Sequence, residues 1–219
     1  MDTLNFKPIY LGQCIIKYQV PLDIFRAINN IYEQNYNNLP PANKTLVGKI
    51  QNEHSIYYMG EDESKVKRNN FLSYNIFKWF EDIYKHYLNH NKIRNYKMNI
   101  NSIWINEMKQ HEYNPTHIHR GTLFTGLSSV MILKLPNTYG VEYSASETPA
   151  NGRLQILGAA NGQFAKVDYQ PPMEIRDFYV FPYDMRHCVY PFNGTDQTRR
   201  TLAANCDVDF NPIENRGAN

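Results

Sequence analysis

The sequence has 219 residues, 42% of them hydrophobic, which is enough for one large folded domain with a core of its own. A formal net charge of +2 gives no electrostatic case for a nucleic-acid partner, and no apolar run is long enough to span a bilayer. Three cysteines without a CxxC spacing predict free thiols in a reducing compartment, and the N-terminus lacks a signal-peptide pattern, so we expect a cytoplasmic protein.

The first part of the chain predicts one strand followed by two helices. Residues 10–20 are β-prone and end at Pro21, and residues 22–32 then carry apolar side chains at helical spacing. Residues 71–88 show the clearest helical stripe of the sequence. We therefore expect a helix-rich front segment.

The stretch between these two helices, residues 42–70, is polar and charged with few apolar anchors. Its composition predicts an exposed connector, and the alternative is a mobile segment over a substrate cleft. On the second helix, His86 and His90 lie four positions apart, but no further ligand is near in sequence. We interpret both as surface or helix-end residues.

From residue 97 onward the sequence changes to short β-prone runs separated by turns. This texture predicts a mainly β (α+β) sandwich or barrel, with the front helices buttressing one sheet. We expect a single domain over residues 1–219, with 1–96 as the buttress, 97–210 as the core and 211–219 as a tail. The β-prone runs are residues 98–106, 117–120, 127–135, 153–157, 178–181, 188–190 and 201–210.

Three histidines of the predicted core form a candidate metal site. His117 and His119 are two positions apart and would point to the same side of a strand. His187 lies between a turn and a short strand. Three neutral imidazoles that leave coordination positions open suit Fe(II), or Zn(II) in a hydrolytic site. The alternative is that all three are packing residues.

The residues around these histidines resemble the 2-oxoglutarate/Fe(II)-dependent oxygenases, and more narrowly oxygenases encoded by tailed phages of marine cyanobacteria. The resemblance covers about residues 97–207. It implies a double-stranded β-helix, which is a jelly-roll barrel of two sheets. The segments that carry it are Asn114-Pro115-Thr116-His117-Ile118-His119, Leu127-Ser128-Ser129-Val130, Phe181-Pro182 with His187 and Pro191, and Arg199-Arg200-Thr201 with Asn205.

The resemblance implies a role for each residue of the site. His117, His119 and His187 would bind iron, while Arg199 and Thr201, on one side of a strand, would grip the distal carboxylate of 2-oxoglutarate. The implied cofactors are Fe(II), 2-oxoglutarate and O2, with ascorbate as an optional reductant. A slip of one residue would exchange Arg199 for its neighbour Arg200. Further candidates for contact with the co-substrate are Tyr113 and Ser129.

The sequence departs from most of this superfamily at His119, where a carboxylate is usual. A neutral third ligand removes one negative charge, which should raise the Lewis acidity of the metal and weaken the retention of Fe(II). The nearest carboxylates that would substitute for His119 are Asp184 and Glu112. We expect His119 to occupy the third coordination position.

Two other classes of protein fit parts of the same pattern. A cupin-type three-His dioxygenase also begins with H-x-H, and the segment from Pro182 to His187 has the length of its second motif. The cupin glutamate is missing, however, and Arg199 with Thr201 would have no role. The third class is a jelly-roll protein without enzymatic activity, in a virion or as a binding module.

The sequence does not identify the substrate. We expect a small molecule or a peptide or protein, and the lack of a basic patch argues against nucleic acid. Residues 137–173, with their glycine-containing turns, are the predicted place of substrate selectivity. If the protein is phage-encoded, its expected compartment is the host cytoplasm. The oligomeric state stays open.

Overall fold

Two antiparallel β-sheets and two α-helices make up the computed structural model, which describes residues 12–60, 67–142, 149–159, 163 and 166–210. The predicted tail, residues 211–219, and the first residues of the predicted strand 10–20 lie outside these ranges. The helices are α1 (Leu22–Asn35) and α2 (Tyr74–His90), and a short 3-10 turn, η1 (Tyr36–Asn38), follows α1. Neither α-helix combines the length and apolarity needed to cross a membrane.

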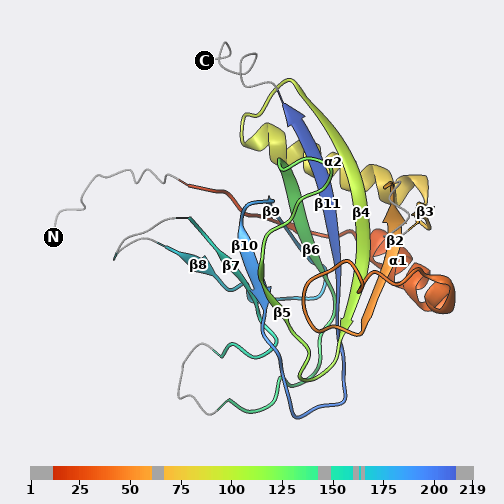
Figure 1. The fold of residues 1–219 in the computed structure, drawn as a ribbon, viewed down its shortest axis with the longest axis vertical. Coiled ribbons are helices and arrows are strands. Elements are labelled where there is room, and N and C mark those ends of the chain that lie inside the picture. The colour runs from red at the N-terminus through yellow and green to blue at the C-terminus, as the bar shows by residue number, and fades with distance from the viewer. Residues whose placement is uncertain (1–11, 61–66, 143–148, 160–162, 164–165, 211–219) are drawn as a thin grey trace.

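The larger sheet has seven strands and the smaller sheet has four (Figure 1). Strands β1, β2 and β3 of the predicted front segment belong to the same sheet as the long strands of the predicted core. The order in the large sheet is β1 (Ile16–Gln19), β9 (Asp177–Pro182), β6 (Gly126–Lys134), β11 (Arg199–Phe210), β4 (Tyr96–Met108), β2 (Asn52–Tyr58) and β3 (Asn69–Asn70). The order in the small sheet is β5 (Asn114–His117), β10 (Arg186–Val189), β7 (Leu154–Leu157) and β8 (Asp168–Tyr169).

The helices pack on one face of the large sheet, and the small sheet lies on its other face (Figure 1). Because side chains alternate along a strand, β11 sends Leu202 and Ala204 into the core beneath the helices. Its neighbours Thr201 and Ala203 line a narrow cavity on the opposite face, between the sheets. The predicted fold class, a mainly β barrel of two sheets buttressed by helices, is thus confirmed.

The prediction of a connector over residues 42–70 is wrong in part, because β2 and β3 lie within this stretch. Strand β2 escaped detection because its residues facing the barrel interior are polar. Glu53 and Ser55 are both buried there, so the apolar alternation typical of a strand is absent. The segment that precedes β2 nevertheless supports the alternative interpretation, since Leu46 and Val47 line the cavities described below.

The strand predicted over residues 117–120 is displaced toward the N-terminus. Strand β5 ends at His117, so His119 lies beyond the strand and is not placed by β alternation. The backbone N–H of His119 instead donates to the carbonyl of Tyr183, at 3.0 Å. Gly121 follows in the same turn, where a side chain would collide with Asn101 and Asp207. Close approach of the backbone to these two residues therefore requires glycine.

We expect Phe178→Ala to destabilise the protein by about 3–5 kcal/mol, because it leaves a cavity where the large sheet packs against α2. The Phe178 ring is fully buried, with centroids 5.2 Å from Trp79 and 5.7 Å from Phe80. The matched control is Phe124→Ala, an exposed position where the change should stay within about 0.5 kcal/mol. Urea unfolding measures both, and equal losses would contradict this account of the buttress.

Candidate metal and co-substrate site

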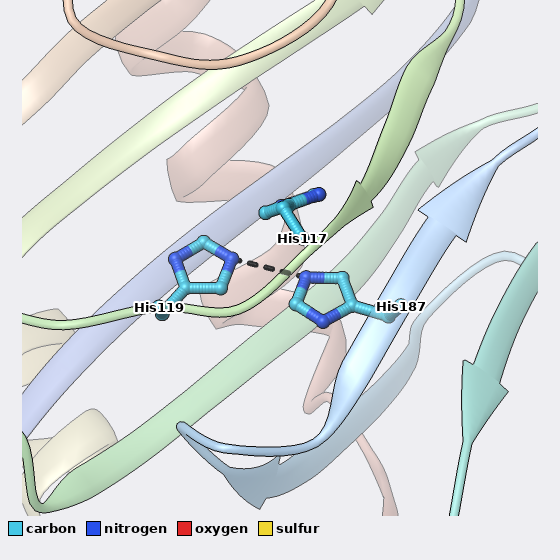
Figure 2. Close-up of side chains that lie close together, drawn as sticks. All are labelled: His117, His119 and His187. Carbon is cyan, nitrogen blue, oxygen red and sulfur yellow. Dashed lines mark hydrogen bonds between the residues drawn. The ribbon is translucent and has the colours of Figure 1, made fainter.

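His117 and His187 face each other across two paired strands. They are direct partners in the register of β5 and β10, and their ring centroids lie 4.3 Å apart. Such opposed positions bring side chains together on one face of a sheet. The sequence separates the two histidines widely, and strand pairing alone brings them together (Figure 2).

Backbone carbonyls select the same tautomer for both rings. Nδ1 of His117 lies 2.6 Å from the carbonyl oxygen of Pro115, and Nδ1 of His187 lies 3.0 Å from that of Met185. A carbonyl only accepts, so in each neutral ring Nδ1 carries the proton and Nε2 keeps a free lone pair. Second partners of this kind orient histidines that bind metals.

His119 completes the group from the turn after β5. Its ring is nearly parallel to that of His187, with centroids 4.8 Å apart and an interplanar angle of 5°. The two Nε2 atoms are 3.0 Å apart, the contact dashed in Figure 2. One ring nitrogen from each of the three histidines lies within 4.8 Å of the others. The structure therefore gathers the three predicted ligands in one place.

Burial keeps the three rings neutral. It lowers the pKa of His187 to about 4, with a further contribution from His117, and lowers the pKa of His117 as well. The pKa of His119 lies well below its usual value, again chiefly through desolvation. All three rings are thus uncharged at neutral pH, with a proton on one nitrogen only. This is the form in which imidazole binds a metal.

The two carboxylates held as substitutes for His119 lie elsewhere. Asp184 is exposed and accepts a hydrogen bond from Gln13 at 2.7 Å. Glu112 accepts from the backbone N–H groups of Gln51 and Lys109. Neither belongs to the cluster of metal-ligating groups. The candidate ligand set in the described part of the chain is therefore three neutral imidazoles.

Arg199 lies in the same cavity as the histidines, together with Thr201. It is 2% exposed, and its contacts are the Thr201 hydroxyl and the Met173 sulfur, both at 3.5 Å, while Nε has no partner. Among the described residues no carboxylate pairs with it. Burial lowers its pKa to about 10, so the guanidinium remains charged at neutral pH. A buried cation without a counter-charge is costly, which favours an anionic ligand here.

Arg200 occupies the other face of β11, as alternation predicts. Its guanidinium contacts Glu33 at 2.7 Å and Glu107 at 3.2 Å, and lies 4.4 Å from the centre of the Tyr32 ring. These partners already satisfy its charge on the helix side of the sheet. Arg199, and not Arg200, therefore lines the cavity that holds the histidines.

The candidate role of Ser129 is corrected by its contacts. Its hydroxyl is 2.8 Å from that of Tyr84 in α2 and donates to the carbonyl of Ala204, so it faces the helices. The strand register puts Ser128 on the inner face instead, where its hydroxyl donates to Asn205. Tyr113 is 40% exposed and does not line the cavity that holds Arg199. The structure thus brings neither Ser129 nor Tyr113 to the candidate co-substrate site.

Three further polar residues near the site were not predicted as functional. The buried Tyr139 hydroxyl has no partner among the described residues, and the positive charge of Arg199 opposes the rise that burial gives to its pKa. Asn106 lines the cavity with an unpartnered side-chain oxygen. Asn205 contacts Nδ1 of His119 at 3.1 Å. Residue type alone gave no signal for these, although strand alternation from Arg199 would have pointed Asn205 inward.

A second, larger hollow of about 700 Å³ adjoins the histidines and shares His119, Trp104, Leu46 and Val47 with the narrow cavity. We call it the amide groove, because three of its lining residues are asparagines. Arg120 is the only Lys, Arg, Asp or Glu in this lining, within the residues that the structure describes. The other polar members of its lining are Asn99, Asn101, Asn205, Thr45, Ser55, Tyr58, Ser102 and Thr122.

The described residues of the predicted selectivity segment, 137–173, contribute to the narrow cavity and not to the groove. Leu154 lines the cavity and Met173 contacts Arg199. Parts of this segment, residues 143–148, 160–162 and 164–165, lie outside the described residues. Its role in selectivity stays a prediction. His86 and His90 are exposed on α2, as predicted.

The donor set fits a divalent transition metal beside a small dicarboxylate. Three Nε2 atoms suit Fe(II), Co(II) or Zn(II) and leave coordination positions for other ligands. The Arg199 guanidinium, with the Thr201 hydroxyl, suits a carboxylate. Nε of Arg199 has no hydrogen-bond acceptor among the described residues, so it is free to donate to a ligand oxygen. The three histidines and the pair Arg199 and Thr201 line the same cavity.

Comparisons with known proteins agree with this fit. Residues 102–205, slightly less than half of the chain, match the family model described as "Putative 2OG-Fe(II) oxygenase". This segment contains all three histidines, Arg199 and Thr201. No curated protein sequence matches the chain significantly.

Solved structures share the fold at low sequence identity. A prolyl-4-hydroxylase from Pseudomonas putida is 14% identical with a TM-score of 0.54, over 90% of this chain and 92% of that chain. A 2OG-Fe(II) oxygenase family oxidoreductase from Burkholderia pseudomallei is also 14% identical with a TM-score of 0.54, over 87% and 84%. A prolyl hydroxylase from Trichoplax adhaerens is 10% identical with a TM-score of 0.53, over 95% and 87%. The segment from residue 102 to 205 is thus similar to the 2OG-Fe(II) oxygenase family, and the solved structures share the two-sheet fold.

Proposed function

We propose that the protein is an Fe(II)- and 2-oxoglutarate-dependent dioxygenase, with hydroxylation as its reaction. The observation that carries this proposal is Arg199, a buried guanidinium that shares a cavity with three convergent histidines and has no carboxylate partner among the described residues. Neither alternative class of protein accounts for it. A three-His cupin dioxygenase needs no such cation, and a packing role for the histidines leaves Arg199 uncompensated.

Each residue of the cavity has a distinct role in this proposal. His117, His119 and His187 would hold the metal through Nε2, and Arg199 with Thr201 would hold the distal carboxylate of 2-oxoglutarate. The bound iron and co-substrate would supply the oxidising chemistry, in which 2-oxoglutarate and O2 give succinate and CO2, and the second oxygen atom of O2 enters the hydroxylated substrate. Ascorbate is the expected reductant for iron that becomes oxidised.

The amide groove supports a substrate larger than a small acid. It reaches His119, so a substrate chain lying in it would pass the metal. Its amides and hydroxyls suit an uncharged chain with many hydrogen-bonding groups, and a single cation is too few for nucleic acid. A peptide or protein segment is therefore our proposed partner. A phage origin and a cytoplasmic location stay predictions.

Arg199→Gln should weaken 2-oxoglutarate binding while leaving metal binding intact. Loss of a charge-assisted hydrogen bond costs about 1.5–3 kcal/mol, so the affinity should fall by roughly tenfold or more. Anaerobic titration of the Fe(II)-loaded protein with 2-oxoglutarate, followed by its visible absorption band, measures this. The matched control is Arg186→Gln, an exposed arginine next to His187. Wild-type protein that binds Fe(II) without developing the band would favour the three-His cupin class instead.

His117→Ala and His187→Ala should each bind less than one tenth of the metal that the wild-type protein binds. Elemental analysis after dialysis against Co(II) measures this amount. Three-ligand sites lose most of their affinity with one ligand because the remaining pair no longer holds the metal in a chelate. His90→Ala, on the exposed end of α2, is the control that should retain full loading. Wild-type protein that takes up no Co(II), Mn(II) or Fe(II) would instead support a non-enzymatic jelly roll.

The metal-free protein should lose stability as the pH falls from about 6.5 toward 4. The unfolded histidines bind protons from their usual pKa near 6.5 downward, whereas His187 in the folded protein does so only near its lowered pKa of about 4. The unfolded state thus binds more protons in this window, and the free energy of unfolding decreases with decreasing pH. His187→Gln should flatten this slope in urea unfolding, and His90→Gln should not; an unchanged slope in His187→Gln would contradict the assignment.

A further inference from the structure

His119 differs from the other two histidines in the partner of its Nδ1. The rings of His117 and His187 each meet a backbone carbonyl, which can only accept. Nδ1 of His119 meets the side-chain amide of Asn205, at 3.1 Å from Nδ2. An amide presents an N–H donor on one side and an oxygen acceptor on the other, so it is compatible with either tautomer of the ring.

The hydrogen bonds around this amide form a continuous chain. The Ser128 hydroxyl donates to Oδ1 of Asn205 at 3.2 Å, which leaves Nδ2 to donate to Nδ1 of His119. His119 then carries its proton on Nε2, opposite Nε2 of His187 at 3.0 Å. Since Nε2 of His187 is unprotonated, it accepts this hydrogen bond. Every member of the chain is satisfied, but Nε2 of His119 has no lone pair for a metal.

Rotation of the same amide by half a turn reverses each of these bonds. Nδ1–H of His119 would donate to Oδ1 of Asn205, and Nδ2 would donate to Ser128, whose hydroxyl both donates and accepts. Nε2 of His119 would then hold a free lone pair, as in His117 and His187. The proton balance is even, because the proton lost from Nε2 is matched by one gained at Nδ1 through water.

We propose that Asn205 is a positioning residue whose amide orientation decides which tautomer His119 adopts, with Ser128 as the hydroxyl that tolerates both orientations. This proposal rests on the proposed function, because it concerns the third ligand of the same site. Asn205 and Ser128 are Cα partners on β11 and β6, and both are buried on the face toward the histidines. The Trp104 ring, 5.8 Å from that of His119, restrains the other side of the imidazole.

The amide also explains how a histidine serves where most of the superfamily has a carboxylate. A carboxylate ligand binds through either oxygen, but a histidine must present one nitrogen and keep the proton on the other. His119 has no backbone carbonyl at Nδ1, so its tautomer depends on Asn205. The orientation of one side chain thus decides whether the chain offers two metal ligands or three.

The test measures Co(II) affinity of the full-length protein by its visible absorption, with two substitutions at the amide and a matched pair of serines. Asn205→Leu, which removes both hydrogen bonds at similar size, should weaken Co(II) binding by about 10–100-fold. Asn205→Asp, which only accepts, should retain the wild-type affinity or exceed it. Ser128→Ala should weaken binding less than Asn205→Leu. Ser129→Ala, on the adjacent residue that faces α2, should leave it unchanged.

Nitrogen-15 NMR of the imidazoles gives a readout that a purely structural role would not change. The His119 proton should lie on Nε2 in the metal-free protein and on Nδ1 in the Zn(II)-loaded protein, whereas His117 and His187 should carry it on Nδ1 in both. A His119 proton on Nδ1 in both states, or equal Co(II) affinity in Asn205→Leu and wild type, would overturn the inference and leave the proposed function standing. Wild-type protein without Co(II) binding would overturn both. If Asn205→Leu does not fold, Ser128→Ala against Ser129→Ala and the NMR tautomers decide.

Discussion

A buried positive charge is the constraint on which the interior of this barrel depends. Arg199 lies between the sheets, where removal of its guanidinium from water carries a free-energy cost that only a negative partner offsets. The described residues provide such a partner for Arg200 on the other face of the strand, but not for Arg199. The fold thus carries a cost at one position that a dicarboxylate ligand would offset, and stability is given up at the candidate binding site.

Strand β11 organises both halves of the molecule through alternation alone. Its outward residues, among them Leu202 and Ala204, join the core beneath the helices. Its inward residues include Arg199 and Thr201 at one end and Asn205 farther along, next to His119. One central strand, hydrogen-bonded on both sides, therefore holds Arg199 and Asn205 in a fixed relation to each other.

The sequence predicted the fold class and the gathering of the three histidines. Short β-prone runs can be recognised in a sequence, and histidines spaced as metal ligands can be recognised in the same way. The sequence could not predict which of two adjacent serines faces inward, since the β6 run is buried on both faces and gives no apolar alternation to read. Strand β2 was missed for a related reason, as Glu53 and Ser55 face a polar interior. Asn205 entered the prediction only as part of a segment that carries the resemblance to the oxygenases.

The position of His119 was predicted for a reason that the structure does not support. Its spacing from His117 suggested one strand face, yet β5 ends before His119 and a backbone hydrogen bond to Tyr183 sets its place. Contacts between segments far apart in sequence carry no local signal, so a motif can identify a residue without giving its geometry.

The short strand β5 is held at the edge of the small sheet by its pairing with β10, which includes the His117–His187 pair. His119 and His187 are 68 positions apart, so a metal joined to both would close a long loop of chain at this edge. It would act as a cross-link between β5 and β10, comparable in effect to a disulfide in a protein that has three free cysteines. The metal would then govern the lifetime of the edge strand, and with it the exposure of that edge to proteases and to other chains.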